Sequence, residues 1–582
     1  MNAADLNEQT LTALLREHGE LVTERLDHWA RTAGERVFFY YGEDDVALSY
    51  AEFARRADHI AGNLARLGIG KGDRVSVMTR NALVSALFMF GIWKAGAVYA
   101  PVNFSFTGRL LSYQLDDTAP RLIVTDAHLL PALNDVAAAL QHKPKLAVYR
   151  APAGAHDAAG PAVAVDAAFG AVAWDELTRE CAAPAVALGF DDVANLIYTS
   201  GTTGPAKGVL QPHRWMAQYT FCMRVLMTED DVIYNDLPMY HVGGAIANIC
   251  RAAWVGCEVA VWNRFSPDGF WPRIAARKVT SAILLDVMIP WLNKAEPKDD
   301  DRLNTLNKVH MQPLALQHHA FAQRFGIDFV TAGFGQTESG LGLWTVIEET
   351  AQDEGTPESL YRGLSHAQLH ELARRYDMVV TPGAQATRKG LMGLPPPFFE
   401  VSVRDASDEL CAPEVAGHLA LRPRLPGILM HAYLGKPDAT VAAFRNLWFH
   451  TGDAALRGHD GMFYYVDRLG DRIRVRGENL SSFQVEDMIN QHPQVQMSAA
   501  VAIASQEGHE DDVVAFVVPV AGQTLEVAAI HAFAAATMPK FMRPAHVRIV
   551  ADLPRTPTNK VEKYKLRQQI LAELAAAAGD KK

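Results

Sequence analysis

Hydrophobic and polar positions alternate along this chain in blocks that have the lengths of strands and helices. In residues 74–126, the strand-length apolar runs RVSVMT, AVYAPV and RLIVTD are separated by helical patterns such as ALVSALFMFGIWKAG. The arrangement returns in residues 231–334, where DVIYNDLPM, GCEVAVW, VTSAILLD and GIDFVTAGF predict strands and ALQHHAFAQRFG predicts a helix. Such alternation is typical of parallel strands joined by crossover helices. Two such blocks predict an α/β fold with two doubly wound parallel sheets packed together.

Two segments interrupt this pattern. Residues 151–174 are rich in Ala, Gly and Pro, and we expect a surface linker there. Residues 345–390 contain PESLYRGLSHAQLHELARRYD, which has helical periodicity and many charged positions. This second segment therefore predicts a surface insertion.

The pattern changes again near residues 467–471. The remainder of the chain mixes the strand-like runs AAVAIAS, DVVAFVVPV and HVRIVADLP with helical segments. This mixture predicts a small α+β domain of about 110 residues, which is a common domain size. We therefore divide the chain into a large N-terminal domain (1–467), a hinge (468–471) and a small C-terminal domain (472–582).

Composition narrows the class of protein. The chain has 582 residues, of which 49% are hydrophobic, and this length is too great for a single core. Its net charge of −11 argues against nucleic acid or an anionic membrane as the main partner. The five cysteines lack metal-ligand spacing and predict reduced thiols in a cytoplasmic protein.

The chain shows neither a signal peptide nor a membrane span. Its first residues, MNAADLNEQTLTALLREHGE, are polar and acidic, unlike a signal peptide. The longest apolar stretch (82–93) ends at Lys94 and is shorter than the roughly 20 residues that a membrane span needs. We expect a cytoplasmic protein whose oligomeric state is either a monomer or a homodimer.

The stretch YTSGTTGPAKGV (198–209) has the composition of a phosphate-binding loop. Its glycines let the backbone approach a ligand, its hydroxyl groups add donors, and Lys207 adds a positive charge. A Walker loop needs a Lys-Ser or Lys-Thr pair at the start of a helix, whereas Gly208 follows the lysine here. The stretch therefore predicts a phosphate site of another kind, with a plain linker as the alternative.

Five further motifs follow in a fixed order. They are LPMYHVGG (237–244), GFGQTES (333–339), WFHTGD (448–453), YYVDRLGDRIRVRGENLSS (464–482) and PRTPTNK (554–560). Together with the loop, they resemble the adenylate-forming superfamily of acyl-CoA synthetases, non-ribosomal adenylation domains and luciferases. GENLSSFQVE and RTPTNKVEKYKLR are most similar to its carnitine/crotonobetaine–CoA ligase branch. The resemblance implies a large domain with a small β-barrel-like part, a mobile small domain, and ATP-dependent activation of a carboxylic acid.

The resemblance also implies where ATP and Mg²⁺ bind. Phe334 would stack on adenine, and Thr337 would face the α-phosphate. Glu338 would hold Mg²⁺, which is commonly bound by one carboxylate together with substrate phosphates. Asp453 and Arg468 would contact the ribose. The complete set implied for ATP is Thr199, Ser200, Gly201, Thr202, Thr203, Gly204, Lys207, Gln312, Phe334, Gly335, Gln336, Thr337, Asp453 and Arg468.

The same resemblance assigns the catalytic groups. Lys560 would stabilise the negative charge that develops when a carboxylate attacks the α-phosphorus. Coenzyme A would then bind along Arg476, Gly477 and Glu478 after the small domain rotates. His241 would lie at the mouth between the acyl pocket and the thiol channel, with a purely structural role as the alternative.

Three positions depart from the family pattern. The hinge position, often charged in the family, is Gly470, which can absorb large backbone changes. Asn559 replaces the usual glycine before Lys560 and also tolerates positive φ. VHMQP (309–313) replaces a stretch of small residues beside adenine, where Gln312 would read the adenine edge.

The motif around His241 bears on the acid that is activated. Amino-acid adenylation domains carry an aspartate just after the aromatic residue that matches Tyr240, and this chain has His241 and Val242. The absence of an aspartate at this position argues against an α-amino acid as the substrate. The residues expected to border the acyl pocket are Gly243, Gly244, Asn248 and Asp286.

Asp286 is a carboxylate inside the otherwise apolar run SAILLDVMI (281–289). A buried carboxylate needs a partner, so one hypothesis is that it faces a cationic acid such as a betaine. The alternative is an N-cap for a helix formed by VMIPWLNKA.

Three functions remain in view. The first is an acid–CoA ligase for a small or medium carboxylic acid, with free coenzyme A as acceptor because no carrier domain follows Lys582. The second is an adenylating enzyme that loads a separate carrier protein. The third is a catalytically inactive nucleotide-binding regulator, which Glu338, Asp453 and Lys560 oppose.

Overall fold

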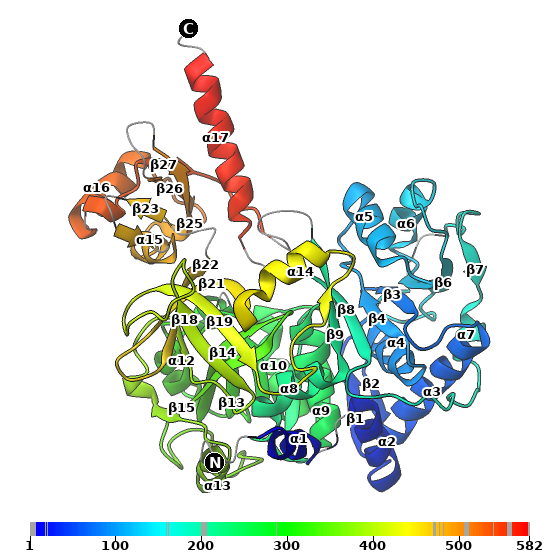
Figure 1. Ribbon diagram of the computed structural model, residues 1–582. Coiled ribbons are helices and arrows are strands. Elements are labelled where there is room, and N and C mark those ends of the chain that lie inside the picture. The colour runs from blue at the N-terminus through cyan, green and yellow to red at the C-terminus, as the bar shows by residue number, and fades with distance from the viewer. Residues whose placement is uncertain are drawn as a thin grey trace.

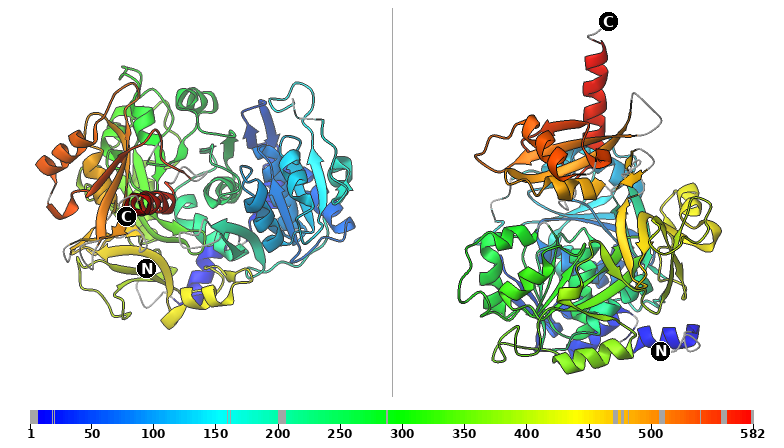
Figure 2. Two further views of the ribbon diagram at one scale, coloured as in Figure 1. Left: turned by 90° about the horizontal axis from the view of Figure 1, so that it is seen from above. Right: turned by 90° about the vertical axis from the view of Figure 1, so that its left-hand side faces the viewer.

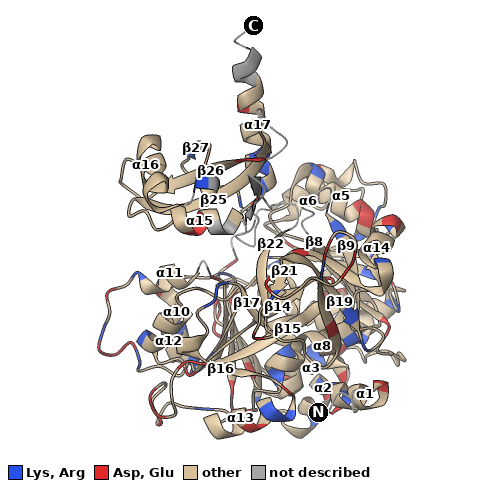
Figure 3. Ribbon diagram, turned by 60° about the vertical axis from the view of Figure 1, so that its left-hand side comes forward, with Lys and Arg blue, Asp and Glu red and all other residues tan. Residues whose placement is uncertain are grey.

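The chain folds into a large part built on three sheets and a smaller C-terminal part that lies at one end of it (Figures 1 and 2). None of the helices in the described chain is long and apolar enough to cross a bilayer. On the side shown in Figure 3, basic and acidic residues are interspersed over the helices of the large part. The computed structural model describes residues 7–17, 19, 21–158, 160, 162–199, 206–286, 288–468, 473–475, 478–480, 482–505, 511–538, 540–555 and 561–579.

The first large sheet has eight strands in the order β20-β9-β8-β4-β3-β5-β6-β7. Its central strands are parallel, and β9 and β20 add an antiparallel edge. The strands are β3 (Arg74–Met78), β4 (Val98–Pro101), β5 (Leu122–Asp126), β6 (Lys145–Tyr149), β7 (Gly170–Val172), β8 (Val193–Thr199), β9 (Lys207–Pro212) and β20 (Ala432–Tyr433). The parallel arrangement predicted from residues 74–126 is confirmed.

Helices of this half explain the apolar stretch around residue 90. Helix α4 is buried along nearly its whole length, and its sequence is therefore apolar on all sides rather than amphipathic. At its end, the Trp93 indole N–H donates to the carbonyl oxygen of Ala194 on β8 at 3.0 Å. The helices are α3 (Tyr50–Arg66), α4 (Ala82–Lys94), α5 (Gly108–Thr118), α6 (Leu130–Ala137) and α7 (Trp174–Thr178).

The second large sheet has nine strands in the order β16-β15-β14-β13-β12-β10-β11-β1-β2. Its central strands β11, β10, β12, β13 and β14 are parallel, whereas β15 is antiparallel to β14. Its edge strands β1 and β2 come from the N-terminal region of the chain. The strands are β1 (Val37–Tyr41), β2 (Val46–Ser49), β10 (Val232–Asn235), β11 (Glu258–Val261), β12 (Ser281–Leu284), β13 (Lys308–Met311), β14 (Phe329–Gln336), β15 (Gly340–Glu348) and β16 (Val380–Pro382).

Helices of several lengths accompany this second sheet. Among them, η2 is a π-helix that continues directly into α9. The elements are α1 (Glu8–Arg16), α2 (Val22–Thr32), α8 (His213–Arg224), η2 (Gly243–Cys250), α9 (Arg251–Val255), α10 (Pro267–Arg277), α11 (Met288–Asn293), α12 (His318–Phe325), α13 (His366–Arg375) and η3 (Gly383–Gln385).

A five-stranded antiparallel sheet, ordered β17-β22-β21-β19-β18, completes the large part. It occupies the place of the expected β-barrel-like part, and its strand order is that of an open sheet. Its strands are β17 (Leu391–Gly393), β18 (Phe399–Arg404), β19 (Gly417–Pro423), β21 (Phe449–Arg457) and β22 (Phe463–Arg468). Two short helices precede β21, namely α14 (Pro437–Ala443) and η4 (Arg445–Leu447).

The small C-terminal part mixes helices and strands, as the sequence predicts. Its hairpin β23-β24 and its three-stranded sheet β25-β26-β27 are accompanied by three α-helices. Lys389 of the large part forms an ion pair with Asp487 on α15, with 2.9 Å between Nζ and Oδ2. The elements are β23 (Ile473–Val475), β24 (Glu478–Leu480), α15 (Ser482–Ile489), β25 (Val495–Ala504), β26 (Asp511–Pro519), α16 (Val527–Thr537), η5 (Lys540–Met542), β27 (His546–Ile549) and α17 (Lys563–Gly579).

The two interrupting segments are both joined to the sheets. Residues 151–174 contain β7, which pairs with β6, so this segment extends the eight-stranded sheet besides linking its neighbours. Residues 345–390 begin within β15 and contain α13 and β16. Because β16 pairs with β15, this second segment forms an edge of the nine-stranded sheet.

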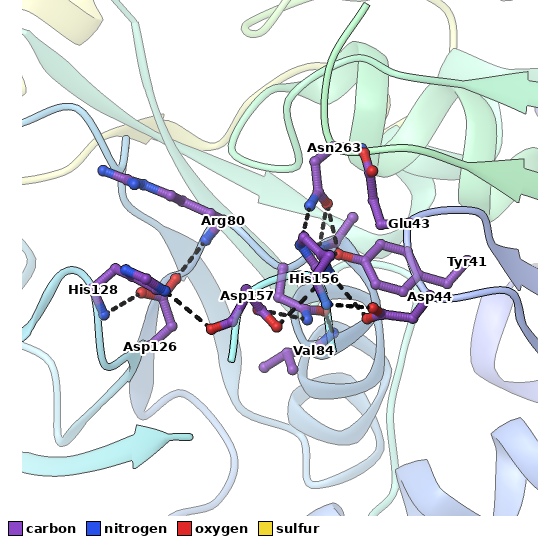
Figure 4. Close-up of polar contacts among 12 residues, drawn as sticks. Tyr41, Glu43, Asp44, Arg80, Val84, Asp126, His128, His156, Asp157 and Asn263 are labelled. Atoms are coloured by element: carbon purple, nitrogen blue, oxygen red, sulfur yellow. Dashed lines mark hydrogen bonds and ion pairs between the residues drawn. The ribbon is translucent and has the colours of Figure 1, made fainter. Parts of the chain in front are cut away.

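His156 fastens residues 151–174 to the other large sheet (Figure 4). Its backbone N–H donates to Asp44 Oδ1 at 2.7 Å, and its Nδ1 lies 3.0 Å from Asp44 Oδ2. Its Nε2 lies 3.0 Å from Asn263 Nδ2, while Asn263 Oδ1 accepts from the Tyr41 hydroxyl at 3.0 Å. These contacts join residues 151–174 to the turn between β1 and β2 and to Asn263, which follows β11.

Histidines from α12 and α13 surround two adjacent glutamates at the end of β15. His366 Nδ1 lies 2.8 Å from Glu348 Oε1, and its Nε2 lies 3.0 Å from Asp328 Oδ1. His318 Nδ1 contacts Glu349 Oε1, and its Nε2 lies 2.9 Å from a backbone carbonyl oxygen. Burial alone would lower the pKa of both histidines, but the hydrogen bonds to these acceptors outweigh it and raise both pKa values.

We expect the thermal stability of the protein to fall as the pH rises from about 6 to about 9. A histidine whose pKa is raised by folding contributes stability below its unfolded pKa of about 6.5 and loses it as the pH passes the folded value. Thermal melts across this range measure the slope. The double variant His318→Gln, His366→Gln should show a shallower slope, and a flat wild-type profile would contradict the assignment.

Candidate active site

Three sheets meet at the end of β14. Gln211 on β9, in the eight-stranded sheet, donates its Nε2 hydrogen to the carbonyl oxygen of Thr337 at 2.7 Å. Gln336, the last residue of β14, donates to Asp453 Oδ2 on β21 at 2.6 Å. Since β21 belongs to the five-stranded sheet, these side chains join all three sheets at one place, which we call the three-sheet junction.

Glu338 and Lys207 both contact Tyr433 at this junction. The Tyr433 hydroxyl donates to Glu338 Oε1 at 3.0 Å, and Lys207 Nζ lies 4.5 Å from the centre of the Tyr433 ring. The backbone N–H of Met430 also donates to the carbonyl oxygen of Glu338 at 2.8 Å. Burial and the charge of Glu338 raise the pKa of Tyr433, so its hydroxyl keeps its proton. The carboxylate of Glu338 remains partly exposed.

Asp453 is held by its neighbours rather than exposed to solvent. Its side chain accepts from Gln336, and its backbone N–H donates to Thr451 Oγ1 at 3.1 Å. Arg468 faces Asp453 in the register of β21 and β22, and the structure describes its backbone only. The ribose contacts of both residues stay predictions, since the chain's own contacts do not test them.

The residues predicted to surround adenine also make contacts within the protein. Gln312 Nε2 donates to the carbonyl oxygen of Gly335 at 3.0 Å, and Gln312 Oε1 lies 3.3 Å from His310 Nε2. These contacts hold the end of β14 to β13. The Phe334 side chain is 6% exposed and packs in the apolar cluster below the five-stranded sheet. Adenine stacking by Phe334 and adenine reading by Gln312 therefore stay predictions.

Several predicted residues lie outside the described chain. They are Ser200, Gly201, Thr202, Thr203 and Gly204 of the loop, Gly470 of the hinge, Arg476 and Gly477 of the coenzyme A face, Asn559, and the catalytic Lys560. Glu478 begins β24, where only its backbone is described. Thr199 and Lys207, which flank the loop, are partly exposed and face each other in the register of β8 and β9.

The predicted acyl-pocket residues have different surroundings. Asn248 on η2 is fully buried, and its amide bonds to Asn235 at 2.9 Å and to Arg251 at 3.0 Å. A Cβ at Gly244 would lie 2.4 Å from the carbonyl oxygen of Leu237, so glycine allows η2 to approach this segment. Asn248 and Gly244 thus support the helix that carries Gly243, which is partly exposed.

His241 and Asp286 are both partly exposed. His241 precedes η2 in the turn where Tyr240 packs against Phe104, with 5.2 Å between the ring centres. Asp286 follows β12, and its backbone carbonyl oxygen accepts from the N–H of Ile289 at 3.3 Å. The betaine and N-cap hypotheses for Asp286 both stay open.

Sequence reasoning missed three residues of this region. Tyr433 and Gln211 carry no local signal, because their partners Glu338 and Thr337 are distant in sequence. Asp236 does have a local signal in the sequence, since it is a carboxylate directly after the apolar strand β10. It is 4% exposed, and burial raises its pKa to about 6.

Comparisons with known proteins agree with this geometry. The model of the AMP-binding enzyme family matches residues 26–434, and the model of the AMP-binding enzyme C-terminal domain matches residues 484–560. A crotonobetaine/carnitine–CoA ligase of Salmonella arizonae is 27% identical, covering 89% of this chain and 93% of its own.

Two solved structures are similar in fold. The anthranilate CoA ligase AuaEII in complex with anthranoyl-AMP has a TM-score of 0.75 at 19% identity, covering 96% of this chain and 98% of its own. ATP-bound MatB from Rhodopseudomonas palustris has a TM-score of 0.73 at 22% identity, covering 94% of this chain and 98% of its own.

Proposed function

Because this chain belongs to the AMP-binding enzyme family, we propose that it is an ATP-dependent, AMP-forming acid–CoA ligase. The single observation that carries the proposal is the three-sheet junction. There, Lys207, Glu338 and Asp453 come together from three sheets, with Tyr433 in contact with the first two. These are the positions that the family resemblance assigns to the phosphates, the metal and the ribose of ATP.

The residues at the junction fit a magnesium ion and a triphosphate. Glu338 offers a partly exposed carboxylate, one oxygen of which already accepts from Tyr433. A single carboxylate together with phosphate oxygens is a common way to bind Mg²⁺. The ion would supply charge neutralisation for the phosphates. Lys207 would add a second positive charge beside the same phosphates.

The first step forms an acyl adenylate. A carboxylate oxygen of the acid attacks the α-phosphorus, the bond to the bridging oxygen breaks, and pyrophosphate leaves with that electron pair. Lys560 is the residue we propose to stabilise the charge on the α-phosphoryl oxygens.

The second step transfers the acyl group to coenzyme A. The thiol loses its proton and attacks the acyl carbon, and AMP leaves as the thioester forms. We propose that the small domain rotates about Gly470 between the steps and brings Arg476, Gly477 and Glu478 to the thiol. An activated intermediate divides one difficult condensation into two displacements.

Pyrophosphate release tests the function directly. The protein is incubated with ATP, Mg²⁺ and a panel of short fatty, aromatic, betaine-type and sulfonated acids, with and without coenzyme A. Acid-dependent release, with a thioester only when coenzyme A is present, supports the ligase. Release without a thioester would favour the carrier-protein alternative. ATP binding without release across the whole panel would favour the inactive regulator.

For the acid itself, we propose a small carboxylic acid with a cationic group, such as a betaine. Its support is the likeness to crotonobetaine/carnitine–CoA ligases together with Asp286 after β12. Asp286→Asn should lower the preference for cationic over neutral acids by about tenfold, which corresponds to the loss of one charge-assisted contact. The matched control is Asp268→Asn, which changes an exposed carboxylate in the first turn of α10. An unchanged preference in Asp286→Asn removes the betaine proposal.

Tyr433→Phe should weaken the response to Mg²⁺ by about tenfold, because outer partners of metal ligands orient them. The variant removes only the hydroxyl that donates to Glu338. The Mg²⁺ concentration for half-maximal pyrophosphate release measures the effect. Tyr40→Phe, which loses a hydroxyl bonded to Asp45 on the surface, is the control. Equal Mg²⁺ dependence in all three proteins would contradict the role of Tyr433.

A further inference from the structure

A small cavity lies inside the large part, between helices α8 and α9 and strands β12 to β15. Its volume is about 20 Å³, and its polar lining is formed by Arg251, Ser281, Lys308, His310 and Thr331. One water needs about 10–15 Å³ on this measure. The cavity therefore has room for a single particle of about the size of a water molecule.

Arg251 brings a positive charge to this cavity, and the carboxylate that attracts it, Asp231, is already paired with Lys308. The side chain is 2% exposed, and its Nη2 donates to Asn248 Oδ1 at 3.0 Å. Its Nε has no hydrogen-bond partner, and among the described residues no carboxylate forms an ion pair with it. Burial lowers the pKa of Arg251 to about 10, so the guanidinium stays protonated at neutral pH. A buried and unpaired charge is strongly unfavourable.

The other polar groups of the cavity do not compensate this charge. Lys308 is paired with Asp231, with 2.9 Å between Nζ and Oδ1. The Asp231 carboxylate is buried and also accepts from the Thr280 hydroxyl at 2.6 Å. His310 contacts Gln312 through Nε2, and burial lowers its pKa to about 4, so it is neutral at pH 7. The lining thus carries one excess positive charge.

A second buried arginine, whose Nε also lacks a hydrogen-bond partner, has more acceptors around its guanidinium than Arg251 has. Arg224 on α8 donates its Nη1 hydrogens to the carbonyl oxygen of Ala217 at 2.9 Å and to Thr220 Oγ1 at 3.1 Å. Its guanidinium also lies 4.7 Å from the centre of the Trp254 ring. Arg251 has one amide oxygen in place of these acceptors.

We propose that this cavity binds a small inorganic anion beside Arg251, and that chloride is its physiological occupant. A water molecule could accept from Arg251 but would leave the positive charge uncompensated. Chloride is only slightly larger than water, and its single negative charge matches the excess charge of the lining. The anion would neutralise Arg251 and hold the junction between η2, which carries Asn248, and strands β12 and β13.

Thermal unfolding of the full-length protein tests the proposal without nucleotide, acid or coenzyme A, so its outcome is independent of the ligase activity. Chloride is exchanged for gluconate at constant pH and ionic strength. We expect about 100 mM chloride to raise the melting temperature by on the order of 2 °C or more. Arg251→Met should remove this response. The control Arg36→Met, which alters a partly exposed arginine paired with Glu229, should keep this response.

Bromide provides a second measurement that needs no variant. Crystals of the wild-type protein soaked in bromide should show an anomalous scattering peak in the cavity next to Arg251. Equal melting temperatures in chloride and gluconate, or a chloride response that persists in Arg251→Met, would overturn the proposal. A cavity that shows only water in the bromide-soaked crystals would overturn it as well.

Discussion

Glu338→Gln should lower acid-dependent pyrophosphate release by about 10²–10³-fold, the loss expected on removal of one strong electrostatic group from a phosphoryl-transfer site. The substitution keeps the shape of the side chain and the acceptor for Tyr433, but it removes the negative charge that we assign to Mg²⁺. Saturating Mg²⁺ should restore part of the rate. Steady-state release at several Mg²⁺ concentrations measures both effects.

A matched variant separates the metal role from a structural one. Glu348→Gln alters a glutamate at the far end of the neighbouring strand β15, where it contacts His366 and His370. It should change the thermal stability and leave the Mg²⁺ dependence of release intact. If Glu338→Gln retained full activity at low Mg²⁺, the assignment of Glu338 to the metal would be wrong.

Lys560→Ala should lower adenylation by at least about 10²-fold while ATP binding stays within about threefold of the wild type. The reason is that the ammonium group stabilises charge that is present mainly in the transition state. Pyrophosphate release measures the chemistry, and nucleotide-dependent thermal stabilisation measures binding.

The nearby Lys565 provides the control for this variant. It is exposed in the first turn of α17 and pairs with Glu562 just before the helix, so Lys565→Ala should be close to wild type in both assays. Loss of ATP binding in Lys560→Ala would show that the lysine binds ATP in the ground state rather than stabilising the transition state. Full activity in that variant would favour a different catalytic group.

The parallel sheets could be predicted from sequence because each of their strands carries its own signal. Runs such as RVSVMT and VTSAILLD are apolar on both faces, as buried parallel strands must be. The N-terminal strand β1 was not predicted by this reasoning, since its partner β11 lies more than 200 residues further along the chain. The same distance effect hid Tyr433, because its partner Glu338 is distant in sequence.

The candidate site was partly predictable for a different reason. Loop and motif residues such as Lys207, Glu338 and Asp453 stand out because their motifs resemble those of the adenylate-forming superfamily. The contacts among them could not be read from spacing. Gln312, for example, is predicted to face adenine, and the motif gives no sign that its amide also joins His310 to Gly335. A long polar side chain has several partners within reach, and only packing selects among them.

The three-sheet junction also limits the order in which parts of the chain can fold during synthesis. Its residues run from Lys207 to Asp453, and no sheet contains them all, so a nascent chain cannot complete the site until β21 has left the ribosome and paired. Contacts of such long sequence separation form late, after much chain entropy has been lost. A ligand bound at this junction would then stabilise the three sheets together rather than one at a time. We therefore expect the whole large part to become resistant to proteolysis in a single cooperative step, when the junction forms.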